Sequence, residues 1–509
     1  MAPSICFLLL SLLFLSSSTS GDEEGFISVV ISDKGLDFAK DILIDQAVAS
    51  IVQSQLPQIE KTVQVPLVGK AKVVLSDITI NDIQVNSSSV NTGETGIALV
   101  VSGATADLSL KWRYSVSSWL VPIGISDSGT ATVKTFISVS DSQNPDVVLC
   151  WKVNDLQVGL TVNLRNQEGT LKLILLDSGC HVRDLSIKLH GGAAWLYQVL
   201  VDAFAGNIAS AVEEAISKKI NEGISTLDLL LQSLPKTIPL DETAALNVSF
   251  VDNPVLSDSA IELEINGLFT GRNEVLVPQA YRRGSDLSAS CGDSSPKMIT
   301  ISLHESVFKS GSLVYFTADS MQWIVDELPD QALLNTAEWR FLIPQLYKKY
   351  PNDDMNLNMS VSSPPDIQVT NKDVGVNIFI DITIDVLEDG EVIPVACISV
   401  DFSASCAVEI VGNNLAGWLK LRKFSTYLKW SKIGKLHMNL IQSVTSTVLK
   451  TVLIPYLNSQ LLRGIPLPIL NGFSIKNARI LYAPPWITVC SDVSFSGDYY
   501  LQQLPAYVS

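Results

Sequence analysis

Residues 156–175 read LQVGLTVNLRNQEGTLKLIL, two alternating segments separated by a short polar turn. Apolar side chains occupy every second position from Leu156 to Leu164, and again from Leu171 to Leu175. A period of two is that of a strand with one buried face. The residues between the segments, 166–169, are Asn, Gln, Glu and Gly, which favour a turn. The stretch therefore predicts two antiparallel strands of a sheet that buries one of its faces.

The chain around this sheet follows a plan of helix, strands and helix that occurs twice. In the first half, residues 32–55 predict a helix capped at Ser32 or Asp33, and residues 193 to about 221 predict a second one that ends at Gly223. In the second half, helices are predicted over roughly 302–326 and over about 435–462, the latter kinked at Pro455. Pro235 and Pro239 predict a stiff extended linker between the halves. A duplication on this scale predicts two similar domains related by a pseudo-twofold axis.

The composition is unusually apolar for a chain without an obvious membrane span. Charged residues make up 17% of the 509 residues, and the mean hydropathy is +0.29. The apolar run at residues 5–15 is too short to span a bilayer and precedes small residues, so residues 1–20 are predicted to be a secretory signal peptide. No later segment has the ~18 uninterrupted apolar residues that a spanning helix needs. The apolar excess is therefore expected either in large cores or in surfaces that hold an apolar ligand.

Cysteines and glycosylation motifs agree with export. Six cysteines remain after the signal peptide, and an even number in an exported chain indicates disulfides. Sequons occur at Asn86, Asn247 and Asn358 and predict N-glycosylation. The net charge is −17, with 16 basic and 24 acidic residues in 21–240 and 19 and 28 in the remainder. Neither half is basic, which argues against nucleic-acid binding.

Catalytic and metal-binding motifs are weak. Gly292-Asp293-Ser294 is the one candidate nucleophile block, and a secreted esterase using Ser294 is an alternative interpretation. The triplet lies in a polar stretch and is followed by Ser-Pro instead of a glycine pair. The four histidines form no HExxH pair, and the chain has no GxSxG elbow or phosphate-binding glycine loop. We therefore predict a protein that is not an enzyme, with no catalytic residues, cofactor or metal.

Several stretches resemble a known family in the right order along the chain. They are ISDKGLDFA (31–39), LKWRYSVSSWLV (110–121), GGAAWLYQVL (191–200), HESVFKSGSLVY (304–315) and IPYLNSQLLRGIPLPIL (454–470). Together they are similar to the bactericidal/permeability-increasing and lipopolysaccharide-binding protein (BPI/LBP) family, whose fold is the tubular lipid-binding (TULIP) fold. The acidic balance makes the chain most similar to the plant branch of that family. The resemblance covers nearly the whole mature chain.

The resemblance implies an α+β fold shaped like a boomerang. Two tubular barrels related by a pseudo-twofold, each a curved antiparallel sheet wrapped on long helices, are joined by a central sheet. The implied divisions are an N-terminal barrel over 21–234, a linker and central sheet over 235–265, and a C-terminal barrel over 266–509. Each barrel would hold the acyl chains of a phospholipid, since every buried methylene contributes roughly 0.8 kcal/mol. We nominate as pocket residues Leu36, Leu43, Ala47, Ile51, Trp195 and Val199 in the first barrel and Val307, Leu313, Val444 and Val448 in the second; each could instead be plain core.

The resemblance also implies recognition of bacterial lipopolysaccharide by basic and aromatic residues at the tip of the N-terminal barrel. The matching positions are Lys70, Lys72, Lys111, Trp112, Arg113, Tyr114 and Trp119. A secreted or apoplastic protein of innate immune recognition, with transient membrane-surface contact, would follow. The alternative within this fold is a phospholipid or sterol-ester transfer protein without endotoxin recognition. The resemblance further implies a Cys150–Cys180 disulfide, and it leaves three pairings open for Cys291, Cys397, Cys406 and Cys490.

Overall fold

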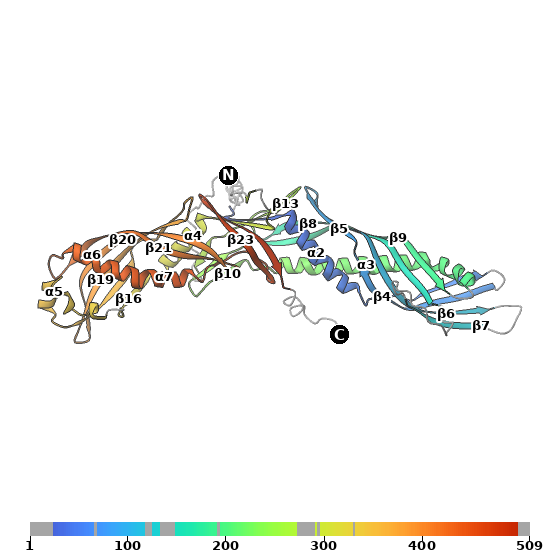
Figure 1. Cartoon of the computed structure of the whole chain (residues 1–509), viewed down its shortest axis with the longest axis horizontal. Coiled ribbons are helices and arrows are strands. Elements are labelled where there is room, and N and C mark those ends of the chain that lie inside the picture. Colours follow the sequence, from blue (N-terminus) through green and yellow to red (C-terminus); the bar gives the residue numbers. More distant parts are fainter. Residues whose placement is uncertain are drawn as a thin grey trace, which may run out of the picture.

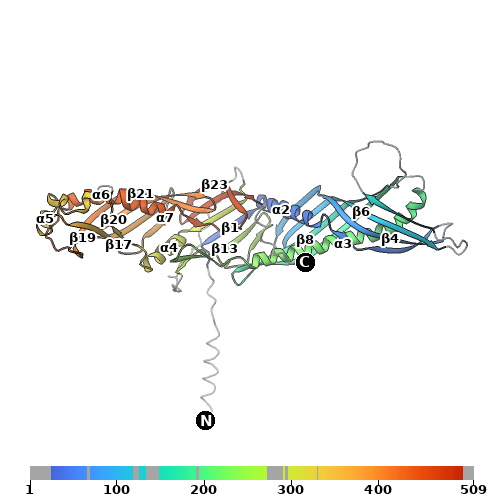
Figure 2. The same cartoon turned by 90° about the horizontal axis from the view of Figure 1, so that it is seen from below.

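The computed structural model describes residues 24–65, 69–117, 125–132, 148–190, 194–271, 291–292, 296–328 and 331–496. The molecule is elongated, with a curled antiparallel sheet wrapped on helices in each half and a central sheet between them (Figures 1 and 2). The predicted α+β fold class is therefore confirmed. The predicted signal peptide and Ser294 lie outside the described residues, and the predicted domain boundaries stay predictions.

The N-terminal barrel is built from an eight-stranded antiparallel sheet whose main path runs β2-β4-β6-β8-β9, with β3, β5 and β7 paired beside it. Its strands are β2 (Gln55–Leu56), β3 (Ile59–Val65), β4 (Gly69–Gln84), β5 (Ser87–Gly93), β6 (Gly96–Ser117), β7 (Ile125–Thr132), β8 (Val148–Gln167) and β9 (Thr170–His190). The hairpin predicted from residues 156–175 is confirmed, because Leu164 lies opposite Leu173 in the β8–β9 register. Glu168 and Gly169 have φ values of 53° and 86°, which a tight turn requires.

Two helices pack on this sheet. α2 (Asp33–Ile51) begins after Ser32, whose side chain accepts a hydrogen bond from the amide of Gly35, so the predicted cap is confirmed. α3 (Ala194–Gln232) is longer than predicted, since it continues past Gly223. Its extension is held to the sheet by Asp228, whose carboxylate accepts a hydrogen bond from the amide of Leu173 at 2.8 Å. A tertiary contact thus outweighs the low helix propensity of glycine at that position.

The C-terminal barrel has a seven-stranded antiparallel sheet in the order β16-β17-β19-β20-β21-β22, with β18 paired to β19. Its strands are β16 (Gln322–Val325), β17 (Asp354–Val361), β18 (Asp366–Val369), β19 (Val374–Glu388), β20 (Glu391–Val411), β21 (Asn414–Ser431) and β22 (Ile465–Pro466). The helix predicted over 435–462 is found as α6 (Met438–Val448), a π-helical turn η3 (Leu449–Leu453) and α7 (Ile454–Leu461). The π-helical turn directly precedes the helical segment that contains Pro455, where the straight ladder of hydrogen bonds is interrupted. Short helical segments η1 (Gln331–Leu334), η2 (Glu338–Arg340) and α5 (Pro344–Lys349) lie between β16 and β17.

The helix predicted over 302–326 is wrong at both ends. Its beginning belongs to strand β15 (Ile299–His304) and its end to β16, which leaves α4 (Glu305–Thr317) as the helix. β15 pairs on both sides, with β1 (Ile27–Ser32) and β24 (Trp486–Phe495). The backbone of residues 299–304 therefore forms sheet hydrogen bonds and does not join the helix. Gly311 lies inside the uninterrupted α4, at a position where a Cβ would come within 3.2 Å of the ring of Phe269, which explains the glycine there.

The central sheet shows the internal duplication directly. Its order is β12-β13-β1-β15-β24-β23, in which β1 leads into α2 and β15 leads into α4. β1 and β15 are antiparallel neighbours, each flanked by a hairpin: β12 (Val255–Ser257) with β13 (Ala260–Ile265), and β23 (Phe473–Ala483) with β24. The order is therefore the same from either edge, as the predicted pseudo-twofold requires.

The proline-containing linker is extended, as predicted, and it is also paired. β10 (Thr237–Pro239) forms a three-stranded sheet with β11 (Ala244–Asn247) and β14 (Phe269–Gly271) beside the central sheet. Buried side chains form one cluster in each barrel and a third at the centre. In the described part of the chain, no helix is both long and apolar enough to cross a bilayer.

The disulfide implied between Cys150 and Cys180 is not formed. Register places Cys180 opposite Val158 and Cys150 opposite Lys188, so the two cysteines lie eight positions apart along the ladder. At ~3.3 Å per residue, this exceeds several-fold the ~7 Å limit between Cα atoms that a disulfide can bridge. Cys180 is a free thiol, and so are Cys397 and Cys406. Among the described residues, a disulfide joins Cys291 to Cys490, with their Cα atoms 5.9 Å apart.

Candidate functional site

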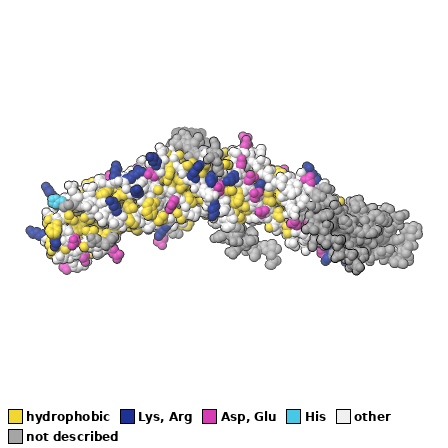
Figure 3. All heavy atoms as spheres, viewed as in Figure 1, with side chains coloured by type: hydrophobic (Ala, Val, Ile, Leu, Met, Phe, Trp, Pro, Cys, Tyr) yellow, Lys and Arg dark blue, Asp and Glu magenta, His cyan; other side chains and the backbone are white. Residues whose placement is uncertain are grey.

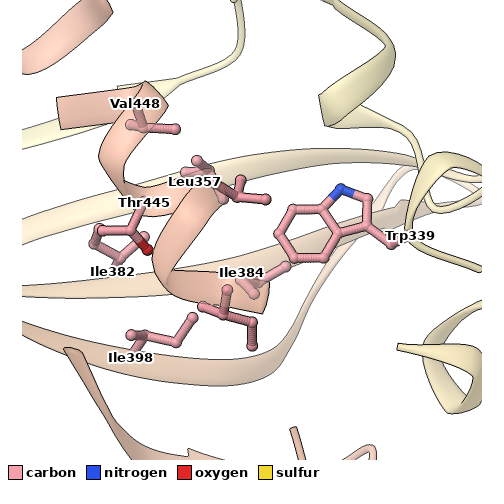
Figure 4. A pocket seen from close by; sticks show the side chains of 9 residues that line it. Trp339, Leu357, Ile382, Ile384, Ile398, Thr445 and Val448 are labelled. Atoms are coloured by element: carbon pink, nitrogen blue, oxygen red, sulfur yellow. The ribbon is translucent and has the colours of Figure 1, made fainter. Parts of the chain in front are cut away.

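An apolar pocket lies inside the C-terminal barrel, between α6 and the inner face of the sheet. Its walls come from five elements, and the free space between them is about 20 Å³. The lining residues are Trp339 (η2), Leu357 (β17), Ile382 and Ile384 (β19), Ile398 (β20), and Ile441, Val444, Thr445 and Val448 (α6). Figure 4 shows the strand side chains and Trp339 converging on the side chains of Thr445 and Val448. Thr445 supplies the one hydroxyl group among these side chains, so the lining suits hydrocarbon.

Local structure explains why these side chains meet. Ile441, Thr445 and Val448 are spaced by four and three residues, which places them on one face of α6. Ile382 and Ile384 are alternate residues of β19 and share the inner face of the sheet. Trp339 closes one end of the pocket, and its indole N–H is satisfied by the carbonyl of Leu333 at 2.8 Å. Its ring can therefore face the apolar space without leaving a polar atom unpaired.

The size of the pocket limits what it holds in this conformation. A free space of about 20 Å³ holds about one water molecule or methyl group, far below the roughly 300–1,000 Å³ typical of small-molecule sites. A second concavity, an open groove of about 570 Å³, runs between the end of β20 and β23 where the barrel meets the central sheet. Its lining mixes apolar residues such as Ile410 and Ile480 with the charged Glu409 and Lys476. In this conformation the pocket has an apolar lining but no room for an acyl chain, whereas the groove has both polar and apolar surface.

The four residues nominated for the second pocket are divided between two places. Val444 and Val448 line the apolar pocket. Val307 is fully buried in the central cluster, packed with strands of the central sheet, and therefore belongs to core. Leu313 is half-buried on α4 and does not line this pocket.

The nominees in the N-terminal barrel need a similar correction. The stripe of α2 that packs on the barrel cluster is Ile44, Val48 and Ile51, so of the nominees on α2 only Ile51 belongs to that cluster. Leu43 is 41% exposed and Ala47 is half-buried, because they lie one residue round the helix from that stripe. Leu36 is buried near the start of the helix. Trp195 and Val199 lie on α3, but their side chains are outside the described part of the structure.

The predicted tip cations share one face of two neighbouring strands. In the β4–β6 register Lys70 lies opposite Ser117, Lys72 opposite Ser115, Val74 opposite Arg113 and Ser76 opposite Lys111. All four cationic side chains are exposed, but two of them are neutralised locally. Lys72 pairs with Glu60 at 2.6 Å and Lys111 with Asp77 at 3.0 Å. Lys70 and Arg113 form no ion pair with a described residue, so they carry the uncompensated charge of this face.

The aromatic positions of the tip alternate with the cationic ones. Trp112 lies opposite Leu75 and Tyr114 opposite Val73, and both of these β4 residues are buried. The side chains of Trp112 and Tyr114 and the whole of Trp119 lie outside the described residues. The joint action of cations and aromatics at the tip therefore stays a prediction.

The three sequons differ in accessibility. Asn86 and Asn358 are exposed, whereas Asn247 is half-buried in β11. The side-chain oxygen of Asn247 accepts hydrogen bonds from the amide and the hydroxyl of Ser249 in its own sequon. Asn358 is thus better placed for glycosylation than Asn247. Asn86 is exposed, but its Nδ2 donates to the carbonyl of Gly103 at 2.6 Å, and modification of all three stays a prediction.

The pKa values of a half-buried thiol, Cys180, and a buried carboxyl group, Asp385, are raised. Burial, with a smaller effect of the Glu213 carboxylate, raises the pKa of the Cys180 thiol to about 12, so this thiol is not a reactive nucleophile at neutral pH. Burial also raises the pKa of Asp385, which follows the pocket residue Ile384 on β19. Asp385 lies opposite Asn356, whose side-chain oxygen is buried without a hydrogen-bond partner. A protonated Asp385 would supply the donor that this oxygen lacks.

Most of the pocket residues were missed by the sequence analysis. Ile382, Ile384 and Ile398 belong to alternating apolar strands, but so do many core residues of the same sheet. Trp339 comes from a short helical segment between strands, with no periodicity to mark it. Alternation identifies the inner face of a strand and cannot tell which inner residues face empty space.

Comparison with known proteins agrees along nearly the whole chain. The family model described as the LBP / BPI / CETP family matches with its N-terminal domain over residues 35–227 and with its C-terminal domain over residues 239–495. A protein of Arabidopsis thaliana assigned to the BPI/LBP family is 47% identical over 490 residues, which is 96% of each chain. Human lipopolysaccharide-binding protein is 24% identical, covering 97% of this chain and 99% of its own length.

A fish relative and a solved structure extend the comparison. The bactericidal permeability-increasing protein of Sebastes schlegelii is 26% identical and covers 92% of this chain and 95% of its own. A crystal structure of lipopolysaccharide binding protein superposes with a TM-score of 0.63 at 19% identity, covering 93% of this chain and 99% of the other. At that identity the structural match shows the fold alone.

Proposed function

This chain belongs to the LBP / BPI / CETP family, and from that membership we propose that it is an exported lipid-binding protein whose C-terminal barrel takes up an acyl chain. The observation that carries the proposal is the apolar pocket between α6 and the sheet, with one hydroxyl group among nine lining side chains. Each methylene transferred from water would contribute roughly 0.8 kcal/mol. The Cys291–Cys490 disulfide supports an oxidising compartment such as the secretory route.

The pocket is nearly closed, so uptake of an acyl chain requires α6 to move away from the sheet. We expect the π-helical turn η3 at the C-terminal end of α6 to act as the hinge. Helices with such a turn bend there more easily than elsewhere. α6 would then tilt while α7 stays fastened to β21, and Val444 and Val448 would line the widened space.

Filling the pocket tests this proposal. Val448→Trp puts a large ring into the space beside Ile398 and should reduce the acyl lipid recovered from the purified protein at least fivefold, because the ring occupies the volume the chain needs. Lipid is extracted from protein of equal amount and quantified by mass spectrometry. Thr447→Trp, on the exposed face of the same helix, is the matched control and should leave the lipid content unchanged. Equal lipid in wild type and Val448→Trp would contradict the proposal.

We further propose that the outer face of β4 and β6 binds the phosphates of bacterial lipopolysaccharide. Lys70 and Arg113 support this interpretation, since they are exposed cations without an ion-pair partner among the described residues. The guanidinium of Arg113 can form paired hydrogen bonds to a phosphate. The ion pairs of Lys72 and Lys111 and the net charge of −17 keep the attraction short-ranged, so strong permeabilisation of bacterial membranes is not expected.

Reversing these two charges should weaken lipopolysaccharide binding. We expect Lys70→Glu with Arg113→Glu to raise the dissociation constant about tenfold at low salt, with the difference shrinking as salt screens the charges. Binding is measured by titrating fluorescently labelled lipopolysaccharide at several salt concentrations. Lys348→Glu with Lys349→Glu, on exposed positions of α5, makes the same change in net charge and serves as control. If both double variants bind lipopolysaccharide equally well, the assignment of the tip residues is wrong and a lipid-transfer protein without endotoxin recognition is favoured.

A further inference from the structure

Charge is distributed unevenly in the C-terminal barrel. Between Glu409 and Asp492, residues 410–491 contain no Asp or Glu. The same segment contains ten basic residues: Lys420, Arg422, Lys423, Lys429, Lys432, Lys435, Lys450, Arg463, Lys476 and Arg479. The second half as a whole is still acidic, because acidic residues before this segment outnumber its basic residues. A strongly basic segment in a chain of net charge −17 calls for an explanation.

Six of these basic residues lie on β21 or in the loop that follows it, together with exposed aromatic residues. Trp418 is 52% exposed, Tyr427 49% and Trp430 37%. Trp418, Lys420, Lys423 and Tyr427 lie opposite Ala407, Ser405, Ser403 and Ser399 of β20, which form the outer face of the sheet. We define the β21 surface as Trp418, Lys420, Lys423, Tyr427, Trp430, Lys432 and Lys435. Figure 3 shows Lys and Arg side chains among hydrophobic ones over this half of the molecule.

The charge of the β21 surface is largely uncompensated. Arg422 and Lys429 are paired with Asp373 and Asp381, and they are left out of the definition for that reason. The four lysines in the definition are exposed and form no ion pair with any residue that the structure describes. Lys432 instead lies 5.5 Å from the ring centroid of Trp430. The carboxylates nearest in register are Asp401 and Glu409 on β20, two against four lysines.

Protection of a sheet edge accounts for only part of this pattern. β22 pairs with Asn414 and Leu415 alone, so most of β21 has no neighbouring strand on its outer side, and lysines discourage another chain from pairing there. Such protection does not call for large exposed aromatic side chains, which favour association. Trp and Tyr beside lysines match the boundary of a bilayer, where aromatic rings lie at headgroup level and lysines attract anionic lipid.

We propose that the β21 surface docks on the surface of an anionic phospholipid bilayer. Each lysine near such a surface adds to the attraction, and the rings of Trp418, Tyr427 and Trp430 enter the headgroup region. Trp418 and Tyr427 face outward on one strand, so both reach a flat surface together. Complementary charge is what favours a bilayer of anionic lipid over a neutral one.

Docking at β21 would place the bilayer next to the apolar pocket, a step that rests on the proposed function. Leu428 of β21 is 36% exposed and lies opposite Ile398, which lines the pocket. α6, the other wall of the pocket, also contacts β21. An acyl chain leaving a docked bilayer would therefore reach the pocket across a single strand. The β21 surface is then the site at which lipid enters or leaves the C-terminal barrel.

The test is flotation of the full-length protein with vesicles of defined composition. Vesicles of phosphatidylcholine with 30% phosphatidylglycerol should bind the wild-type protein, and vesicles of phosphatidylcholine alone should bind it much less. Lys420→Glu with Lys423→Glu should reduce binding to the anionic vesicles at least tenfold, and Trp418→Ser with Tyr427→Ser should reduce it about fivefold. Because all four side chains are exposed, thermal unfolding of these variants should match the wild type.

Lys348→Glu with Lys349→Glu is again the control with the same change in net charge. A loss as large in this control as in Lys420→Glu with Lys423→Glu would overturn the proposal, since net charge alone would then explain binding. Unchanged binding by the aromatic variant would overturn it too. So would wild-type protein that binds the soluble polyanion polygalacturonate and not the vesicles. Lipid content is measured in parallel to separate the two proposals. If the protein carries no bound lipid but still floats with vesicles in a way that depends on the β21 surface, docking is supported and lipid binding in the pocket is contradicted.

Discussion

Protein with Cys291→Ala and Cys490→Ala is expected to lose about 4 to 5 kcal/mol of unfolding free energy. The disulfide connects residues 199 apart, and that loop contains nearly all of the C-terminal barrel. Cross-linking so long a loop removes much conformational entropy from the unfolded chain, which is the main source of the stabilisation. Cys490 is fully buried on β24 and lies opposite Thr300, so the bond also joins the segment before β15 to the central sheet.

The measurement is urea unfolding of the wild type with and without reductant, beside the double variant. Reductant should lower the midpoint of the wild type and leave that of the variant unchanged. Cys180→Ala is the control, since this free thiol closes no loop, and it should keep the wild-type response to reductant. Peptide mapping without reduction should recover a Cys291–Cys490 pair. Recovery of Cys150–Cys180 instead, or a variant as stable as the wild type, would contradict the disulfide assignment.

Asn458→Ala is expected to cost about 3 kcal/mol of unfolding free energy. Asn458 of α7 is 3% exposed, and its amide bonds both backbone groups of Leu419 on β21. The side-chain oxygen accepts from the Leu419 amide at 2.7 Å, and the side-chain nitrogen donates to the Leu419 carbonyl at 3.2 Å. The side chain thus replaces a neighbouring strand at the outer edge of β21. Alanine would leave two buried backbone groups unpaired, and each unpaired group carries its full desolvation penalty.

Unfolding in urea gives the free energy, and hydrogen exchange locates the effect. The amide of Leu419 should exchange faster in Asn458→Ala, while amides in the N-terminal barrel keep their protection. Ser459→Ala is the matched control: its side chain is exposed and, among the described residues, bonds only the carbonyl of Tyr456, so its cost should stay below about 0.5 kcal/mol. If Asn458→Ala lowers the unfolding free energy by less than about 1 kcal/mol and the Leu419 amide stays protected from exchange, then α7 does not depend on this contact.

Patterns within a few neighbouring residues were enough to predict much of the fold. The hairpin of β8 and β9 and the cap of α2 at Ser32 depend on periodicity or on local backbone chemistry. The duplication also follows from the order of such patterns, and the symmetric central sheet confirms it. The sequence alone thus determined the α+β class, the two halves and, through family resemblance, the tubular architecture.

Tertiary structure decided everything that depends on residues far apart in the chain. Register separated Cys150 from Cys180, and strand packing brought Cys291 to Cys490. Contacts with the sheet determine that α2 packs through Ile44 rather than Leu43. A hydrogen bond from the Leu173 amide to Asp228 stabilises the part of α3 that follows Gly223. The apolar pocket forms where side chains from five elements leave space between them. Ion pairs determine which lysines remain without a charged partner. Periodicity shows which way a side chain faces, but only the folded chain determines what it meets there.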